Sequence, residues 1–181
     1  MQVQDLKLRK ELKIVNVVCT ADIKQKVNIV KFVEFPWGIY DEAIYHGKCG
    51  YVKIPGVQGR VAIFTSGKMI SVGSKSVNDA KNKLQLAKFY LVTNKFIQDT
   101  TLLPVIRNIV ATCSFGITFD LEKLAHFIPG CLYEPEKFPG LIYNIHDSVT
   151  CLLFASGKAV IVGSRSIEEL NSAYFDLQKI I

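Results

Sequence analysis

Two stretches of the sequence bring aromatic, hydroxyl and cationic side chains together in the same order. They read FTSGKMISVGSKS from Phe64 to Ser76 and FASGKAVIVGSRS from Phe154 to Ser166, with eight of thirteen positions identical. The SGK turn in each is not a phosphate-binding loop, because no glycine lies five residues before Gly67 or Gly157 and the residues that follow have strand character. The repeated groups therefore suit contact with a partner surface rather than nucleotide binding.

An enzymatic site is one alternative, and the sequence offers it little support. The three histidines do not lie at equivalent positions relative to the two stretches. Neither G-x-S-x-G nor H-E-x-x-H occurs in the sequence. Five cysteines form an odd set without a C-x-x-C pair, which favours buried thiols in a reducing compartment over metal ligands or disulfides. They are Cys19, Cys49, Cys113, Cys131 and Cys151. We predict a protein that is not an enzyme and that has no metal or cofactor.

Composition indicates an intracellular, soluble, globular chain. Of 181 residues 49% are hydrophobic and 21% charged, no run of about 18 uncharged apolar residues occurs, and the N-terminus lacks the apolar core of a signal peptide. Residues 1–90 hold 15 basic against 7 acidic residues, a net +8, whereas residues 91–181 hold 7 against 9, a net −2. A basic first half favours a polyanion such as nucleic acid. The alternative is a solvated lysine-rich helix face.

The two similar stretches belong to a longer tandem repeat. Starting from NVVCT at Asn16 and NIVAT at Asn108, the halves keep step through YDEAIYHG and YEPEKFPG to the C-terminus, with offsets of 90 to 93 residues. A period this long, repeated only twice, indicates a duplicated domain rather than a solenoid. We expect one repeat over residues 1–97 and a second over residues 98–181.

Within each half, strand and helix patterns alternate in the same sequence. A β-branched strand at residues 13–22 or 105–115 precedes a short helix, around residues 27–35 or 120–127. Three strands follow, then a longer helix that starts at an N-cap serine, Ser76 or Ser166. This order predicts an α+β fold in which helices cover one face of a sheet. Because both faces of the last strands are largely apolar, the uncovered face implies a partner.

The chain resembles the TATA-box-binding protein family from about Asn16 to the C-terminus. NIVAT, YEPEKFPGLIY, the paired SGK turns with their following VGS[KR]S, and the direct repeat carry the resemblance. It implies a pseudo-two-fold saddle: one curved antiparallel sheet of about ten strands with four helices on the convex face. Its concave face would bind and bend A·T-rich promoter DNA in the minor groove. The chain looks most like an archaeal member, which implies a cytoplasmic or nucleoid location, or a nuclear one in a eukaryote.

The resemblance also implies roles for single residues. Four aromatic side chains would insert between base pairs: Tyr45, Phe64, Phe138 and Phe154. Base contacts in the minor groove would come from Asn16, Val18, Val72, Asn108, Val110 and Val162. An asparagine amide can donate to A N3 or T O2 but is crowded by the guanine amino group, which favours A·T pairs. Tyr45 replaces the family's phenylalanine, and two valines replace its usual threonine or serine, which leaves the strictness of selection open.

Contacts to the DNA backbone and to proteins complete the expectations. The backbone contacts would come from Lys68, Lys75, Lys158 and Arg165, with Ser66 and Ser156 beside them. Glu134 and Glu136 match the acidic loop that binds the transcription factor IIB homologue, and RNA polymerase would follow. The free protein could dimerise through its apolar face. The alternative within the family is a divergent paralogue that acts mainly as a protein-interaction scaffold with weak DNA selectivity.

Overall fold

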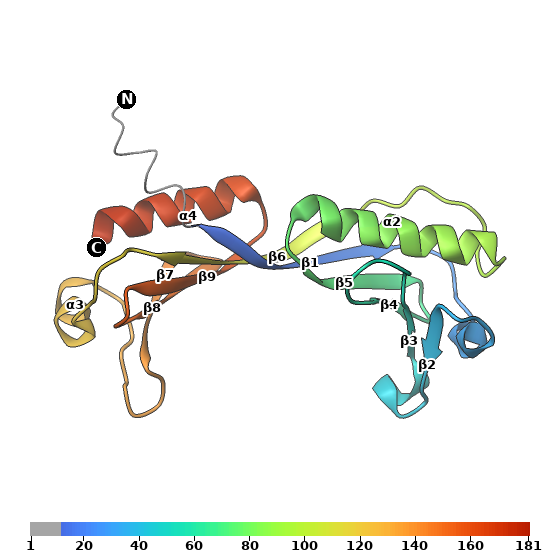
Figure 1. The fold of residues 1–181 in the computed structure, drawn as a ribbon, viewed down its shortest axis with the longest axis horizontal. Coiled ribbons are helices and arrows are strands. Elements are labelled where there is room, and N and C mark those ends of the chain that lie inside the picture. The colour runs from blue at the N-terminus through green and yellow to red at the C-terminus, as the bar shows by residue number, and fades with distance from the viewer. Residues whose placement is uncertain (1–11) are drawn as a thin grey trace. The chain divides into compact units, whose positions relative to one another are not determined.

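The computed structural model describes residues 12–181, in which the chain forms two compact units (Figure 1). The first unit is Asn16–Arg107, and the second joins Met1–Val15 to Asn108–Ile181, of which residues 12–15 and 108–181 are described. Each unit consists of antiparallel strands with helices packed against them. The predicted α+β class is therefore confirmed.

The first unit contains five strands, two 3-10 helices and one α-helix. They are β1 (Lys13–Asp22), η1 (Ile29–Glu34), β2 (Gly38–Tyr40), η2 (Ile44–Gly47), β3 (Cys49–Val52), β4 (Val61–Phe64), β5 (Lys68–Ser74) and α2 (Val77–Thr93). The strand order is β2-β3-β4-β5-β1, and each neighbouring pair runs antiparallel. The helix expected around residues 27–35 forms as a 3-10 helix, whose three-residue turn places Ile29 and Phe32 on one buried side.

The second unit repeats this plan with four strands and two α-helices. They are β6 (Val105–Ser114), α3 (Leu121–Phe127), β7 (Gly140–His146), β8 (Val149–Phe154), β9 (Lys158–Ser164) and α4 (Ile167–Ile180). Residues 13–15 at the start of β1 belong to this unit, and residues 105–107 at the start of β6 belong to the first. The strand order is β6-β9-β8-β7. Where β2 pairs with β3 in the first unit, the second has only an isolated bridge between Leu132 and Ile142. The described residues thus form nine strands, close to the ten expected.

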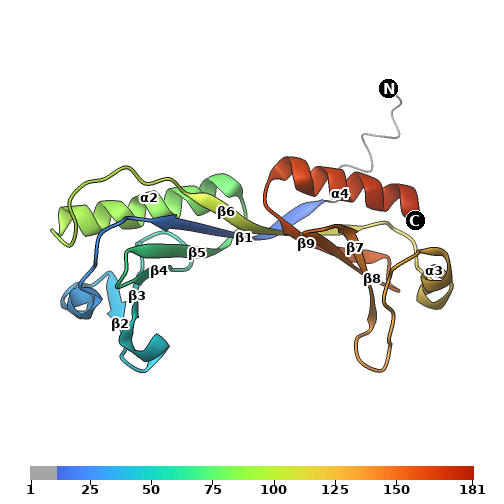
Figure 2. The ribbon, with the colours of Figure 1, turned by 180° about the vertical axis from the view of Figure 1, so that it is seen from behind.

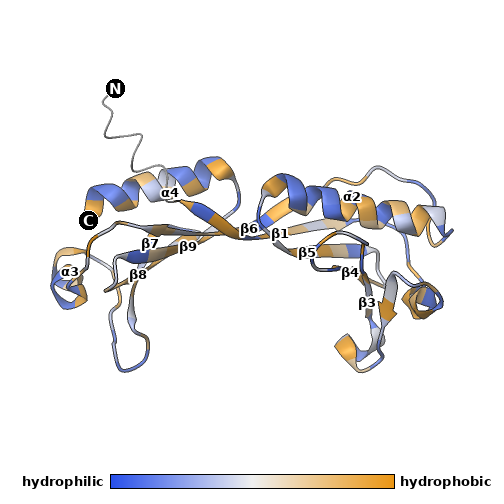
Figure 3. Cartoon of the chain, in the orientation of Figure 1, coloured by the Kyte–Doolittle hydropathy of each residue, from blue (hydrophilic) through white to orange (hydrophobic). Residues whose placement is uncertain are grey.

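A long helix lies along one side of the strands in each unit, as both views show (Figures 1 and 2). The helix α2 packs on β4 and β5, and α4 packs on β7 and β9. Ser76 and Ser166 cap them as predicted, each accepting a hydrogen bond of 3.1 Å from the backbone N–H three residues on. Both helices alternate hydrophilic and hydrophobic residues (Figure 3). One set of apolar residues is buried, including Leu84 and Leu91 of α2 and Leu170 and Leu177 of α4, whereas Phe89 and Phe175 are exposed. The opposite side of each unit's sheet is left without a helix.

The structure also shows the state of the cysteines and whether residues 12–181 contain membrane-spanning helices or groups of metal-binding side chains. Four cysteines are buried free thiols as predicted, but Cys131 is half-buried, with its Sγ 3.6 Å from the carbonyl oxygen of Ala125. No helix in residues 12–181 is long and apolar enough to cross a membrane. That same part of the chain contains no group of three or more His, Cys, Asp or Glu side chains placed to hold a metal ion.

Candidate nucleic-acid interface

Alternate residues of each strand point away from the helices and make up what we call the open face of each unit. In the first unit, one row of directly paired residues crosses this face: Tyr51 on β3, Ala62 on β4, Ile70 on β5 and Thr20 on β1. The equivalent row in the second unit is Ile142, Leu152, Val160 and Thr112. Paired residues of antiparallel strands share a face. None of the eight is buried, so both rows are accessible.

The six residues expected to contact bases all lie at open-face positions of β1, β5, β6 and β9. They are Asn16, Val18, Val72, Asn108, Val110 and Val162, and none of them is buried. Val72 is 49% exposed, which is high for a valine in the middle of a strand. Val110 pairs directly with Val162. The open faces therefore carry apolar side chains that nothing in the described part of the chain covers.

The two asparagines are held by hydrogen bonds to glycine. The side-chain carbonyl of Asn16 accepts from the N–H of Gly73, and that of Asn108 accepts from the N–H of Gly163, each at 2.9 Å. Both glycines have positive φ, 82° and 107°, and the strand register shifts nearby, as in a β-bulge. Since the carbonyl oxygens are engaged, the amide –NH₂ group is the part of each side chain left for a ligand. The structural bond to glycine and a donor role toward a ligand are thus compatible.

The structure brings the expected aromatic side chains together as one pair in each unit. The Phe138 and Phe154 rings lie 5.9 Å apart at 63°, and the Tyr45 and Phe64 rings lie 5.8 Å apart at 68°. Such edge-to-face contacts are a favourable arrangement for aromatic rings. Tyr45 is 63% exposed. Each unit therefore presents two rings together at one end of its strands.

The two pairs are supported differently from beneath. Gly140 stands directly opposite Phe154, and a Cβ there would lie 2.7 Å from the Phe138 ring. The first unit has Cys49 at this position, opposite Phe64. Tyr45 reaches Phe64 from a turn in which Tyr45 and His46 have left-handed φ values of 49° and 53°. Such backbone is strained for residues other than glycine and occurs at functional sites more than elsewhere.

A hollow lies beside each aromatic pair, and the two hollows match. The one in the first unit has a volume of about 470 Å³ and includes Phe64, Ser66, Lys68, Thr20 and Ile70 in its lining. The one in the second unit, of about 630 Å³, is lined by their repeat equivalents Phe154, Ser156, Lys158, Thr112 and Val160. Both serines and both lysines are exposed. The SGK turns thus place a hydroxyl and a cation at the rim of a partly apolar hollow.

One further cation follows the last strand of each unit. Lys75 and Arg165 are exposed and precede the N-cap serines of α2 and α4. The backbone N–H of Arg165 donates to the Glu169 carboxylate at 2.6 Å, and the Ser148 hydroxyl donates to the same carboxylate at 2.7 Å. These bonds lower the pKa of Glu169, the Arg165 N–H most strongly. None of the ion pairs found in residues 12–181 includes the guanidinium of Arg165.

Two arginines of the first unit were missed by sequence reasoning. The Arg107 Nε donates to the Thr20 hydroxyl at 2.9 Å, at the rim of the first hollow. The Arg60 guanidinium carbon lies 4.5 Å from the centre of the Tyr51 ring, a cation–π contact. Strand alternation from Asn16 would have placed Thr20 on the open face. Neither arginine could be assigned to it without the strand register.

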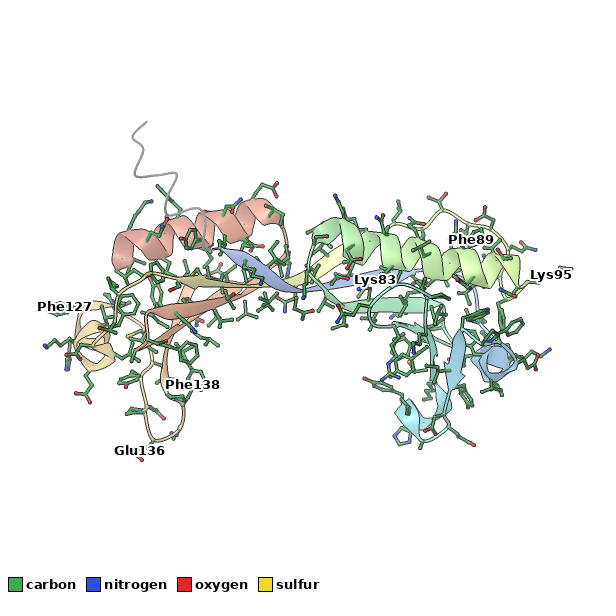
Figure 4. The ribbon with its side chains drawn as sticks, viewed as in Figure 1. Lys83, Phe89, Lys95, Phe127, Glu136 and Phe138 are labelled. Atoms are coloured by element: carbon green, nitrogen blue, oxygen red, sulfur yellow. The ribbon has the colours of Figure 1, made fainter. Side chains whose placement is uncertain are left out.

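The acidic loop before β7 has one paired and one unpaired glutamate among the described residues. Glu134 lies 2.5 Å from the Nζ of Lys137, and its backbone carbonyl accepts from the N–H of Phe138 at 2.9 Å. Glu136 projects from the tip of the loop, and Phe138 lies nearer the strands (Figure 4). In the first unit Asp41 instead accepts a backbone bond from Ala43. The loop thus offers a carboxylate close to the aromatic pair.

Comparison with known proteins gives one consistent result. The family described as transcription factor TFIID (or TATA-binding protein, TBP) matches residues 11–92 and 103–181. A TATA-box-binding protein of Cenarchaeum symbiosum (strain A) is 46% identical over 169 residues, which cover 93% of this chain and 93% of that protein. One from Methanocaldococcus jannaschii is 33% identical over 183 residues, covering 96% and 93%.

A solved structure supports the same relationship in three dimensions. The structure described as Methanococcus jannaschii TBP matches with a TM-score of 0.81 at 29% identity, over 94% of this chain and 97% of that one. The match covers both units and both sets of strands. With the repeat, the asparagine–glycine bonds and the paired rings already established, these matches show that the chain belongs to the TATA-binding protein family.

Proposed function

We propose that the chain is a transcription initiation factor that binds A·T-rich promoter DNA in the minor groove through the open face of each unit. The observation that carries this is the fixed orientation of Asn16 and Asn108, whose carbonyls are bonded to Gly73 and Gly163. Each leaves an amide donor among apolar side chains. The minor groove of an A·T pair shows only the acceptors A N3 and T O2, whereas a G·C pair adds the guanine amino group. An amide donor on an apolar surface can bond to the acceptors of an A·T pair, whereas the guanine amino group of a G·C pair lies in its way.

Bending would follow from the aromatic pairs. Phe138 with Phe154, and Tyr45 with Phe64, present ring edges beside hollows rimmed by lysine. Proteins that bind the minor groove often insert apolar side chains between base pairs, which unstacks the step and bends the duplex, and this family is a standard example. The Tyr45 hydroxyl would retain a water or phosphate partner, because this side chain is largely exposed.

The cations around each open face would hold the phosphates. Lys68, Lys75, Lys158 and Arg165 are all exposed, with Ser66 and Ser156 beside two of them. We add Arg107, whose Nε is fixed on Thr20 at 2.9 Å and whose remaining N–H groups can reach a phosphate. Contacts of this kind fix position and make binding depend steeply on salt.

Protein partners would bind on the second unit. Glu134 and Glu136 would bind a basic surface of the factor IIB homologue beside the bent DNA, which is supported by the exposure of Glu136 at the loop tip (Figure 4). That complex would recruit RNA polymerase. In the absence of DNA, the apolar open faces would favour a homodimer. The scaffold alternative is favoured by Val72 and Val162, which lack the hydroxyl that the family resemblance leads us to expect there.

A binding comparison tests the proposal. Two end-labelled duplexes, one A·T-rich and one G·C-rich, are titrated at a stated salt concentration, and bending is followed by energy transfer between the ends. We expect a preference for the A·T-rich duplex and strong bending, both with the wild-type chain. F138A with F154A should abolish the bending, whereas the surface change K31Q should not. Equal binding of both duplexes, also with the factor IIB homologue present, would support the scaffold.

A further inference from the structure

We propose that Arg60, stacked on Tyr51, is a DNA contact that only the first unit possesses, and that it biases which unit occupies which half of an asymmetric A·T-rich site. The inference rests on the proposed function and deepens it. It concerns orientation, which the matched features of the two units leave undetermined. The rings, the asparagines and the SGK lysines occur in both units.

The geometry places Arg60 on the open face of the first unit. Tyr51 pairs with Ala62 and shares its face, and Arg60 lies two residues before Ala62 in the strand alternation. The Arg60 guanidinium carbon is 4.5 Å from the centre of the Tyr51 ring. A planar guanidinium on an aromatic ring keeps its edge N–H groups available for another partner. Arg60 is exposed, and none of the ion pairs found in residues 12–181 includes it.

The second unit has no cation at the equivalent place. The residue that corresponds to Tyr51 in the paired row is Ile142, which stands opposite Leu152. Arg60 corresponds, at the offset of 90, to Thr150, whose hydroxyl donates to the side-chain carbonyl of Asn144 at 2.9 Å. A neutral hydroxyl engaged with its neighbour cannot replace an exposed guanidinium. The two open faces therefore differ by one fixed positive charge at this point.

The other end of the same row does not produce such a difference. In the first unit Arg107 is bonded to Thr20, and in the second unit the exposed Lys13 borders the hollow beside Thr112. Each unit thus has a cation at that end. The contrast between Arg60 with Tyr51 and Thr150 with Ile142 is consequently the clearest break in the equivalence of the two open faces.

DNA sequence would convert this difference into orientation. Runs of adenines in unbound DNA have a narrow minor groove with enhanced negative potential, which attracts arginine, whereas alternating T-A steps are more easily unstacked and bent by inserted rings. The first unit should therefore occupy the half of the site that carries the adenine run. Because Arg60 would contact DNA in either orientation, the bias equals the difference between its interactions with the two halves, and we expect it to be several-fold.

Single-molecule energy transfer measures this bias directly. The duplex has an adenine run in one half, alternating T-A steps in the other, and an acceptor dye at one end. The donor dye is attached at position 95 through a reactive unnatural amino acid; Lys95 is exposed just after α2 (Figure 4). The two orientations give two transfer efficiencies. We expect unequal populations for the wild-type chain, with the first unit on the adenine run.

Five variants define the outcome. R60T installs the residue of the second unit and should move the populations to near equality, as should Y51I. In the R60T background, Y51I should add nothing, because Tyr51 acts by positioning Arg60. I142Y with T150R gives the second unit the same pair and should also remove the bias. K31Q removes an exposed charge elsewhere in the first unit and should leave the ratio unchanged.

The results separate this inference from the proposed function. Equal populations for the wild-type chain, or an R60T ratio equal to that of the wild type while bending persists, would overturn the role of Arg60 and leave the proposed function intact. A wild-type chain that shows no preference for A·T-rich DNA would overturn both. Circular dichroism and the urea midpoint verify that each variant is folded before its ratio is compared.

Discussion

Asn108 and Gly163 are joined by a hydrogen bond of 2.9 Å in which the side-chain carbonyl accepts and the backbone N–H donates. The same relationship joins Asn16 to Gly73. In each case the bond decides the rotation of an amide whose oxygen and nitrogen would otherwise be interchangeable. The strand irregularity and the ligand-binding chemistry are therefore properties of the same side chain.

Replacing Asn108 by aspartate tests the donor role separately from the structural one. The carboxylate in N108D can still accept from Gly163, but it cannot donate and it adds a negative charge beside the bases. We expect the urea midpoint to change little and affinity for A·T-rich DNA to fall by about tenfold or more, because the amide donor is lost and the carboxylate is repelled by the base acceptors. N108A is the matched control, since it also loses the bond to Gly163 and should lower stability by about 1 kcal/mol. Unchanged affinity in N108D would contradict the donor role.

The two bulge glycines should differ in their tolerance of a side chain. Both have positive φ, but nothing lies within 4 Å of a Cβ built on Gly73, whereas a Cβ on Gly163 would collide with the Ser148 carbonyl oxygen. G73A should therefore lower the free energy of unfolding by about 1 kcal/mol, the usual penalty for left-handed backbone. G163A should lower it clearly more. Urea denaturation of both variants measures this, and equal losses would show that the backbone near Ser148 yields.

Val72 and Val162 should control how strictly bases are selected. Threonine at these open-face positions adds a hydroxyl of nearly the same size, which can bond an acceptor at a base edge. We expect V72T with V162T to increase the ratio of affinities for A·T-rich over G·C-rich duplexes several-fold. The titration is done at one fixed salt concentration. A ratio that stays constant or falls would mean that these side chains contribute only apolar contact.

Glu169 should contribute to the acid stability of the second unit. Hydrogen bonds from the Arg165 N–H and the Ser148 hydroxyl lower its pKa in the folded chain. A carboxylate with a lowered folded pKa stabilises the protein above its unfolded pKa, near 4.5, and that contribution is lost as pH falls through the folded value. Urea midpoints from pH 6 to pH 3 should therefore decline less steeply for E169Q than for the wild type. Parallel curves would contradict the assignment.

Local sequence patterns correctly predicted the elements that occur in both halves. The serine caps, the paired last strands and the long helices all follow from residue types within a few positions. The prediction that the chain is not an enzyme is confirmed by its membership of a family of transcription factors. The strand β2 was missed because three residues, GIY, carry too little alternation, and the half-buried Cys131 lies in a loop where no periodicity applies.

Features that depend on register could not be predicted from the sequence. The stacking of Arg60 on Tyr51 requires β3 and β4 to pair with Tyr51 opposite Ala62, and residues nine apart in sequence give no sign of that. The Arg107 bond to Thr20 spans 87 residues. The open-face asparagines were predicted, but their rotation depends on glycines 55 and 57 residues away.

Gly140 and Cys49 stand opposite the equivalent rings of Phe154 and Phe64, but they are not interchangeable. A side chain at Gly140 would displace Phe138, so cysteine is tolerated at position 49 only because Tyr45 arrives on a longer, left-handed segment. The lengthened segment and the cysteine form an epistatic pair, in which reversal of one without the other leaves either a collision or a void beneath the rings.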